Sequence, residues 1–238
     1  MKFKAVMLML LFLVLIIIFC SIIFFVIKNP ITDYTREDII ELLESGRDYN
    51  NYSFCKSDED NEVIVKFKDN IEVISTKKMT VYINFNEDKQ IIIPPKDNIA
   101  LVSKPLSTST QNHINDAIWY LKEESWDYRC IGKDMCNGLE CVKVRLTQTI
   151  SSEGYTESWL DMLQKDTEES DVNYIMCTLD FWISLESGLV AKTVLNGESD
   201  TGENEMLIYD YKLQLNTVTD DDIKLPDLQD YEVKYIDN

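Results

Sequence analysis

The sequence predicts an α+β protein, mainly antiparallel β, in which a curved sheet or incomplete β-barrel with covering helices follows one N-terminal transmembrane helix. Three observations support this prediction. The run Ala5–Ile27 is almost wholly apolar and uncharged, most of the chain after Tyr49 alternates apolar and polar residues, and two short segments have apolar residues at helical spacing. We expect residues 1–28 to form a cytoplasmic tip and the transmembrane helix, residues 29–34 a linker, and residues 35–238 one extracytoplasmic domain.

The run Ala5–Ile27 is long enough to cross a hydrocarbon core of ~30 Å as a helix. Secretory signals have a shorter apolar stretch that ends at small residues, whereas this run ends with bulky ones, so we expect it to be retained. Lys2 and Lys4 precede the run, and all 42 Asp and Glu residues follow it. Because basic flanks stay in the cytoplasm, the sequence predicts a single-pass protein of the cell membrane with its N-terminus inside.

Two amphipathic helices are expected in the outer domain. Thr35 and the acidic residues after it are typical of an N-cap and first turn, and Gly46 is typical of a C-cap. Because this helix carries several carboxylates, we expect it to pack on its own domain rather than on the membrane. Residues 107–109 can cap the second helix. The apolar positions of the two helices are Ile39, Leu42 and Leu43, and Ile114, Ala117, Ile118 and Leu121.

The remaining elements are expected to be strands. Between Tyr49 and Val102 the alternating runs are separated by short polar linkers, as in an antiparallel meander. Asn137-Gly138 predicts a type I′ hairpin that pairs Cys136 with Leu139 and Asp134 with Cys141. Residues 151–171 are acidic and are expected to form an inserted loop or short helix. Strands are predicted over residues 175–183, 189–195 and 207–215, with a loop over 196–204, and an edge strand over 231–235.

Five cysteines follow the predicted span, namely Cys55, Cys130, Cys136, Cys141 and Cys177. In the hairpin register, Cys136 and Cys141 are diagonal neighbours at the outer limit of disulfide geometry. Their spacing is not the usual pattern of zinc ligands. The sequence favours small buried thiols and leaves a bridge between these two open.

Three segments resemble a known family. They are Gly132–Asp134 with Asn137–Val144, Asp180–Ile183 with Glu186–Lys192, and Asp220–Pro226 with Tyr231–Val233. They are similar to the central hairpin, a strand–turn–strand and the closing segment of the LolA/LolB-like superfamily, which includes lipoprotein carriers and RseB-type sensor domains of the bacterial envelope. The resemblance covers about Thr35–Tyr235. It implies an incomplete antiparallel barrel, closed by helices, whose hydrophobic cavity binds or senses acyl chains or lipoproteins. The carriers are soluble, so the predicted span would make this chain a membrane-anchored variant.

The predicted function is a binding module that accommodates an acyl chain or a lipidated polypeptide in such a cavity. The alternative is an envelope sensor or assembly protein with a solid core, which acts through protein contacts. Sequence alternation is the same for a filled and a hollow barrel, so both stay open. The candidate cavity residues are those on the inward side of the predicted strands: Phe67, Val81, Ile83, Leu179, Phe181, Tyr209 and Tyr211.

The sequence contains no motif of a known catalytic site. His113 is the single histidine, and its polar surroundings suggest a surface helix residue. Residues 220–222 lack the alternating ligands of a calcium loop and are interpreted as a solvated turn. We therefore expect no enzyme activity, no cofactor and no metal. The formal net charge of −19 repels phosphate backbones, so nucleic acid is not an expected partner.

Overall fold

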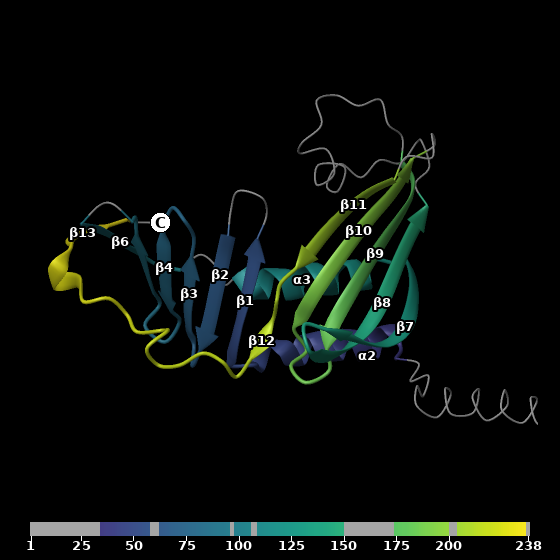
Figure 1. The fold of residues 1–238 in the computed structure, drawn as a ribbon, viewed down its shortest axis with the longest axis horizontal. Helices are drawn as coiled ribbons and strands as arrows, with labels where there is room; N and C mark the ends of the chain where they lie inside the picture. The colour runs from purple at the N-terminus through teal and green to yellow at the C-terminus, as the bar shows by residue number, and fades with distance from the viewer. Residues whose placement is uncertain are drawn as a thin grey trace, which may run out of the picture. The chain divides into compact units, whose positions relative to one another are not determined.

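The computed structural model of the protein describes residues 34–57, 62–95, 98–105, 109–149, 174–199 and 204–236. All of these belong to one compact unit, Tyr34–Asn238. The described ranges contain two α-helices, α2 (Arg36–Ser45) and α3 (Ser109–Lys122), and two mainly antiparallel sheets (Figure 1). The predicted α+β class is confirmed.

The predicted transmembrane helix is not among the residues that the structure describes. Within the described ranges, no helix combines the length and the apolar character needed to span a bilayer. The predicted span over residues 5–27 and the predicted insertion over residues 151–171 both lie outside these ranges.

The first sheet has eight strands in the order β12-β1-β2-β3-β4-β5-β6-β13. Its central strands form the predicted meander, and the turn residues Asn70 and Asp88 have φ values of 65° and 52°, which Asn and Asp tolerate better than other residues. The predicted edge strand is present as β13 (Glu232–Tyr235), which runs parallel to β6. The meander strands are β1 (Asn51–Ser57), β2 (Glu62–Lys68), β3 (Ile71–Ser75), β4 (Thr80–Asn84), β5 (Lys89–Ile93) and β6 (Ile99–Ser103).

The second sheet has five strands in the order β11-β10-β9-β8-β7. The hairpin prediction is confirmed, because Asn137 and Gly138 have positive φ values of 53° and 81° and the register pairs Cys136 with Leu139. The loop expected over residues 196–204 is shorter, because β10 continues to Ser199. The strands are β7 (Asp127–Cys136), β8 (Leu139–Thr149), β9 (Tyr174–Ser184), β10 (Val190–Ser199) and β11 (Asn204–Asp210).

The expected open antiparallel architecture is present, but as two sheets and not one, because the predicted strand 207–215 divides between them. Its first part is β11, which pairs with β10, and its last part is β12 (Gln214–Leu215), which pairs with β1. Between them, the backbone N–H of Tyr211 donates to the carbonyl of Ala191 at 3.1 Å, and its carbonyl accepts from the N–H of Cys55 at 2.8 Å. Lys212 then turns the chain with a φ of 45°. One segment therefore belongs to both sheets.

Both helices pack on the sheets through the predicted apolar stripes. Thr35 and Asp38 form a reciprocal capping box at the start of α2, with distances of 3.1 Å and 2.8 Å. Ile39 and Leu43 are fully buried, and the four predicted apolar residues of α3 are buried in the same core. This core also contains inward-facing residues of both sheets.

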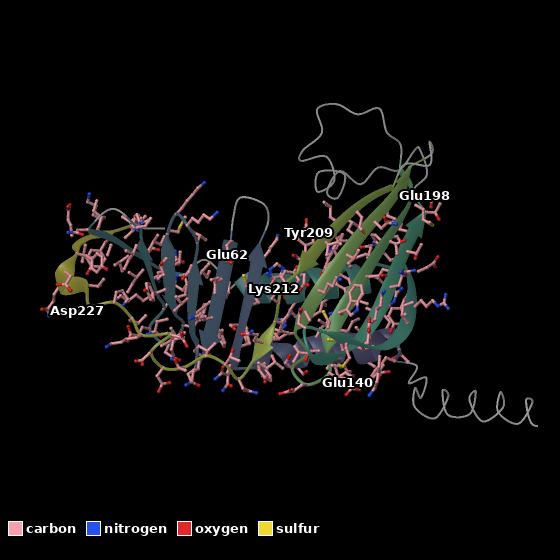
Figure 2. All side chains as sticks on the ribbon, viewed as in Figure 1. Glu62, Glu140, Glu198, Tyr209, Lys212 and Asp227 are labelled. Carbon is pink, nitrogen blue, oxygen red and sulfur yellow. The ribbon has the colours of Figure 1, made fainter. Side chains whose placement is uncertain are left out.

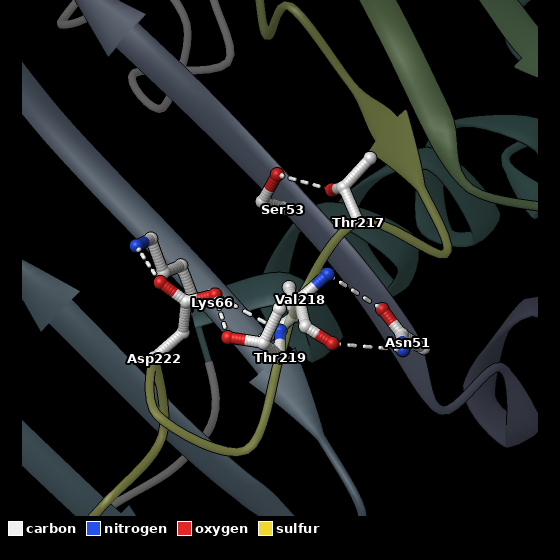
Figure 3. A network of polar contacts seen from close by, with 7 residues as sticks. All are labelled: Asn51, Ser53, Lys66, Thr217, Val218, Thr219 and Asp222. Atoms are coloured by element: carbon white, nitrogen blue, oxygen red, sulfur yellow. Dashed lines mark hydrogen bonds and ion pairs between the residues drawn. The ribbon is translucent and has the colours of Figure 1, made fainter.

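Residues 216–231 cross the face of the meander that is turned away from α3. Val218 and Ile223 pack on Val73 of this face. The segment is also held by polar contacts, in which Asn51 exchanges two hydrogen bonds with the backbone of Val218, and Lys66 pairs with Asp222 at 2.5 Å (Figure 3). The predicted turn over residues 220–222 is present, with Asp220 and Asp221 exposed, and Asp222 also pairs it with β2.

Cys55, Cys136, Cys141 and Cys177 are free thiols. Cys136, Cys141 and Cys177 are buried, and burial raises the pKa of Cys141 and of Cys177 to about 12. No bridge joins Cys136 to Cys141, in agreement with the favoured prediction. Within the described ranges, no cluster of three or more His, Cys, Asp or Glu side chains is arranged to hold a metal ion.

Candidate functional site

A pocket of about 230 Å³ lies between α3 and the inward face of the five-stranded sheet. The ladder register explains why its strand residues share one face, since Phe181 is opposite Thr193 and Thr193 is opposite Tyr209. The lining residues are Lys56, His113, Asp116, Tyr120, Trp126, Leu179, Phe181, Val190, Thr193, Leu195, Tyr209 and Tyr211.

The wall of the pocket is mostly aromatic and aliphatic. Tyr120 packs edge-on against Trp126, with ring centroids 5.7 Å apart, and reaches Phe181 at 6.5 Å. Trp126 and Phe181 are buried although they border the pocket. This wall offers a ligand apolar contact area on the helix side and on the sheet side.

Charged groups lie at the part of the lining formed by β1, β11 and α3. The ammonium group of Lys56 lies 4.2 Å from the ring centroid of Tyr209, a cation–π contact (Tyr209 is labelled in Figure 2). Asp116 of α3 is exposed, and partial desolvation raises the pKa of its carboxyl. The lining therefore combines an apolar wall with one cation and one carboxylate.

The interpretation of His113 as a surface residue was wrong. Its Nδ1 lies 3.4 Å from the hydroxyl of Tyr211, and the two ring centroids are 4.8 Å apart. Burial, with a smaller contribution from Lys56, lowers the pKa of His113 to about 4, so the imidazole is neutral at neutral pH. Burial also raises the pKa of Tyr211 to about 12. His113 and Tyr120 are seven residues apart on α3, and this helical spacing places both at the pocket. The spacing is visible in the sequence and was the signal that could have identified them.

The seven sequence-predicted cavity residues fall into two groups. Leu179, Phe181, Tyr209 and Tyr211 line the pocket. Phe67 instead stacks on Tyr52, with ring centroids 5.1 Å apart.

Val81 and Ile83 lie on β4, away from the pocket. Ile83 and Phe67 are both opposite Glu72 of β3, so they share one face of the eight-stranded sheet. Of the pocket residues that were not predicted, His113, Asp116 and Tyr120 lie on α3, and their place in the lining depends on how this helix packs on the sheet.

No protein family matches the chain, and no curated protein matches it either. Solved structures that it resembles include MucB in complex with periplasmic MucA, at 10% identity and a TM-score of 0.39 over 82% of this chain and 61% of that chain. The Pseudomonas aeruginosa MucA/MucB complex matches at 11% identity and a TM-score of 0.37, over 84% of this chain and 64% of that chain.

A putative outer membrane lipoprotein-sorting protein domain from Vibrio parahaemolyticus matches at 9% identity and a TM-score of 0.22, over 79% of this chain and 97% of that chain. The chain spans about three fifths of the length of the MucB chains that it matches. At these values of identity and TM-score, the similar structures do not assign the chain to a family.

Proposed function

We propose that the chain is a membrane-anchored extracytoplasmic binding module whose pocket accommodates an apolar group of an acyl chain or a lipidated polypeptide. The observation that carries this proposal is the pocket of about 230 Å³ between α3 and the five-stranded sheet. Its volume exceeds the ~150 Å³ of a cavity that binds benzene. It is below the ~300–1,000 Å³ of sites for drug-sized ligands.

This volume sets the size of the ligand group. One aromatic ring or a short aliphatic stretch fills the pocket, and the rest of a longer acyl chain stays outside it. Lys56 and Asp116 border the pocket, where the polar part of an amphiphile would lie.

Photo-crosslinking tests the pocket. The full chain is purified in a mild detergent and irradiated with a short photoactivatable fatty acid, and the labelled peptides are mapped by mass spectrometry. We expect labels on β9, β10 and α3. Leu195→Trp fills the pocket and is expected to reduce labelling by about tenfold or more, which corresponds to ~1.4 kcal/mol of binding free energy.

Val194→Trp is the matched control, because Val194 is the neighbouring residue and its side chain faces the opposite side of the sheet. It is expected to leave labelling unchanged, and thermal unfolding of both variants verifies that they are folded. Equal labelling of the two variants, or labels confined to other segments, would contradict the proposal.

The proposed location follows from residues 5–27, which we expect to anchor the domain with the N-terminus in the cytoplasm. Protease protection in sealed vesicles tests this orientation. Cleavage near Tyr235 from the extracytoplasmic side is expected, and protection of this region on that side would overturn the orientation.

A further inference from the structure

The two sheets end in four outer strands, and three of these have features that discourage pairing with another chain. β12 has two residues. β13 has four, of which Glu232 and Lys234 are charged and pair with each other at 3.4 Å. β7 is interrupted by a bulge between Cys130 and Gly132, where Gly132 has a φ of 118°. Short length, charge and bulges are the usual protections of sheet edges.

β11 is neither short nor bulged, and its charged residues Glu205 and Asp210 stand near its two ends. It pairs with β10 over seven consecutive residues without a register shift. Met206 and Ile208 project from the outer face of the sheet and are 61% and 52% exposed. Along the described chain, β11 ends its sheet, and no other strand pairs with its second edge. A regular strand edge with exposed apolar side chains is a site for pairing with an additional strand.

The hydrogen bond that follows the C-terminal end of β11 shows which backbone groups of this strand are directed toward β10. The N–H of Tyr211 donates to the carbonyl of Ala191 on β10, at 3.1 Å. Because N–H and C=O groups alternate in direction along a strand, those of Met206 and Ile208 are directed away from β10. The free edge therefore presents at least two donors and two acceptors with the spacing of a β-ladder.

We propose that the free edge of β11 binds an extended polypeptide segment as an additional strand. An array of alternating backbone donors and acceptors matches another backbone, whereas an acyl chain offers no groups to pair with it. Met206 and Ile208 favour a segment that carries apolar side chains on the outer face. The proposal does not depend on occupancy of the pocket.

Charge decides between possible segments. The chain carries 42 acidic and 23 basic residues, so a segment flanked by Lys or Arg is attracted to it. A second copy of the chain carries the same net charge of −19 and is repelled. The partner is therefore a different polypeptide, extended and basic at its ends.

The test uses the full chain in nanodiscs and a synthetic peptide of alternating Val and Thr flanked by lysines. Binding is followed by fluorescence anisotropy, and amide hydrogen exchange locates it. We expect saturating peptide to slow exchange at Met206 and Ile208 by about tenfold or more. N-methylation of the alternate amides that face β11 removes the peptide's N–H donors on that edge. It is expected to weaken binding by a similar factor without any change in the protein.

Ile208→Lys is the protein variant, and Ile131→Lys on β7 is its control, because Ile131 is 44% exposed and the added charge is the same. Only Ile208→Lys is expected to weaken binding. The proposal is overturned if the peptide does not bind, if N-methylation has no effect, or if slowed exchange appears on β7 instead of β11. Fatty-acid labelling of the pocket is expected to be normal in Ile208→Lys, so failure of the two proposals can be told apart.

Discussion

Substitution of Gly188 by Ala tests the closest approach between α2 and the β9–β10 turn. Gly188 has a φ of 67°, and a Cβ atom there would overlap the carbonyl oxygen of Leu42 and lie 2.8 Å from the nitrogen of Gly46. Both neighbours are backbone atoms at the end of α2. The substitution therefore forces the helix away from the turn.

The expected loss of stability has two parts. A left-handed backbone costs an L-residue ~1–2 kcal/mol. Displacement of α2 loosens the packing of Ile39 and Leu43, which are fully buried, and loss of one such side chain costs ~2–5 kcal/mol. We expect a total of about 3 kcal/mol or more. At ~2–4 °C per kcal/mol for a domain of this size, the midpoint of thermal unfolding falls by about 6–12 °C.

Two other glycines separate these contributions. A Cβ at Gly138 would meet no atom within 4 Å, but the φ is 81°, so Gly138→Ala reports the backbone cost of ~1–2 kcal/mol alone. Gly46 has an ordinary helical φ of −63°, but its Cβ would lie 2.7 Å from the carbonyl oxygen of Gly188, so Gly46→Ala reports the clash alone. Thermal unfolding of the full chain in detergent, followed by near-ultraviolet circular dichroism, compares the three variants. Equal effects of Gly188→Ala and Gly138→Ala would refute the tight contact.

Three further predictions concern pH and thiols. The pKa of His113 is about 4 when folded and ~6.5 when unfolded, so the free energy of unfolding falls between these pH values as acid is added, and His113→Asn should abolish this fall in denaturant titrations. The hydrogen bond from Lys66 lowers the pKa of Asp222, so this contact stabilises the folded state above pH ~4, and the stabilisation is lost as the pH falls further. The prediction is contradicted if Asp222→Asn leaves the pH dependence of the free energy of unfolding in acid unchanged. Burial raises the pKa of Cys141 and Cys177 to about 12, so neither should react with a disulfide reagent at about pH 8 before denaturant is added, as peptide mapping would reveal.

Local chemistry made several elements predictable from the sequence. The Asn137-Gly138 hairpin and its register follow from the positive φ values that a two-residue turn requires. The start of α2 follows from Thr35 and Asp38, whose side chains and backbones are close enough to pair without help from the rest of the fold. In both cases the determining contacts join residues that are near in sequence.

Features that depend on distant contacts were not predictable. The division of residues 207–215 between two sheets depends on the turn at Lys212 and on the N–H of Cys55, which is far away in sequence. Likewise, Val81 and Ile83 alternate as a half-buried strand should, but they lie outside the core that contains α3. An alternating pattern identifies the inward face of a strand, and only the packed helix determines which part of that face borders a pocket.

The position of residues 204–236 also has a consequence for folding. These residues supply β11, β12 and β13, and the contacts of Lys68 with Asp220, Lys66 with Asp222 and Asn51 with Val218 join positions 152, 156 and 167 apart in sequence. Loops of this length must close before such contacts form, which is typical of slow folding. The meander is synthesised early but keeps an uncovered face and two unpaired edges until this late segment arrives. During synthesis the domain is thus most vulnerable to proteases and aggregation just before its last strands emerge.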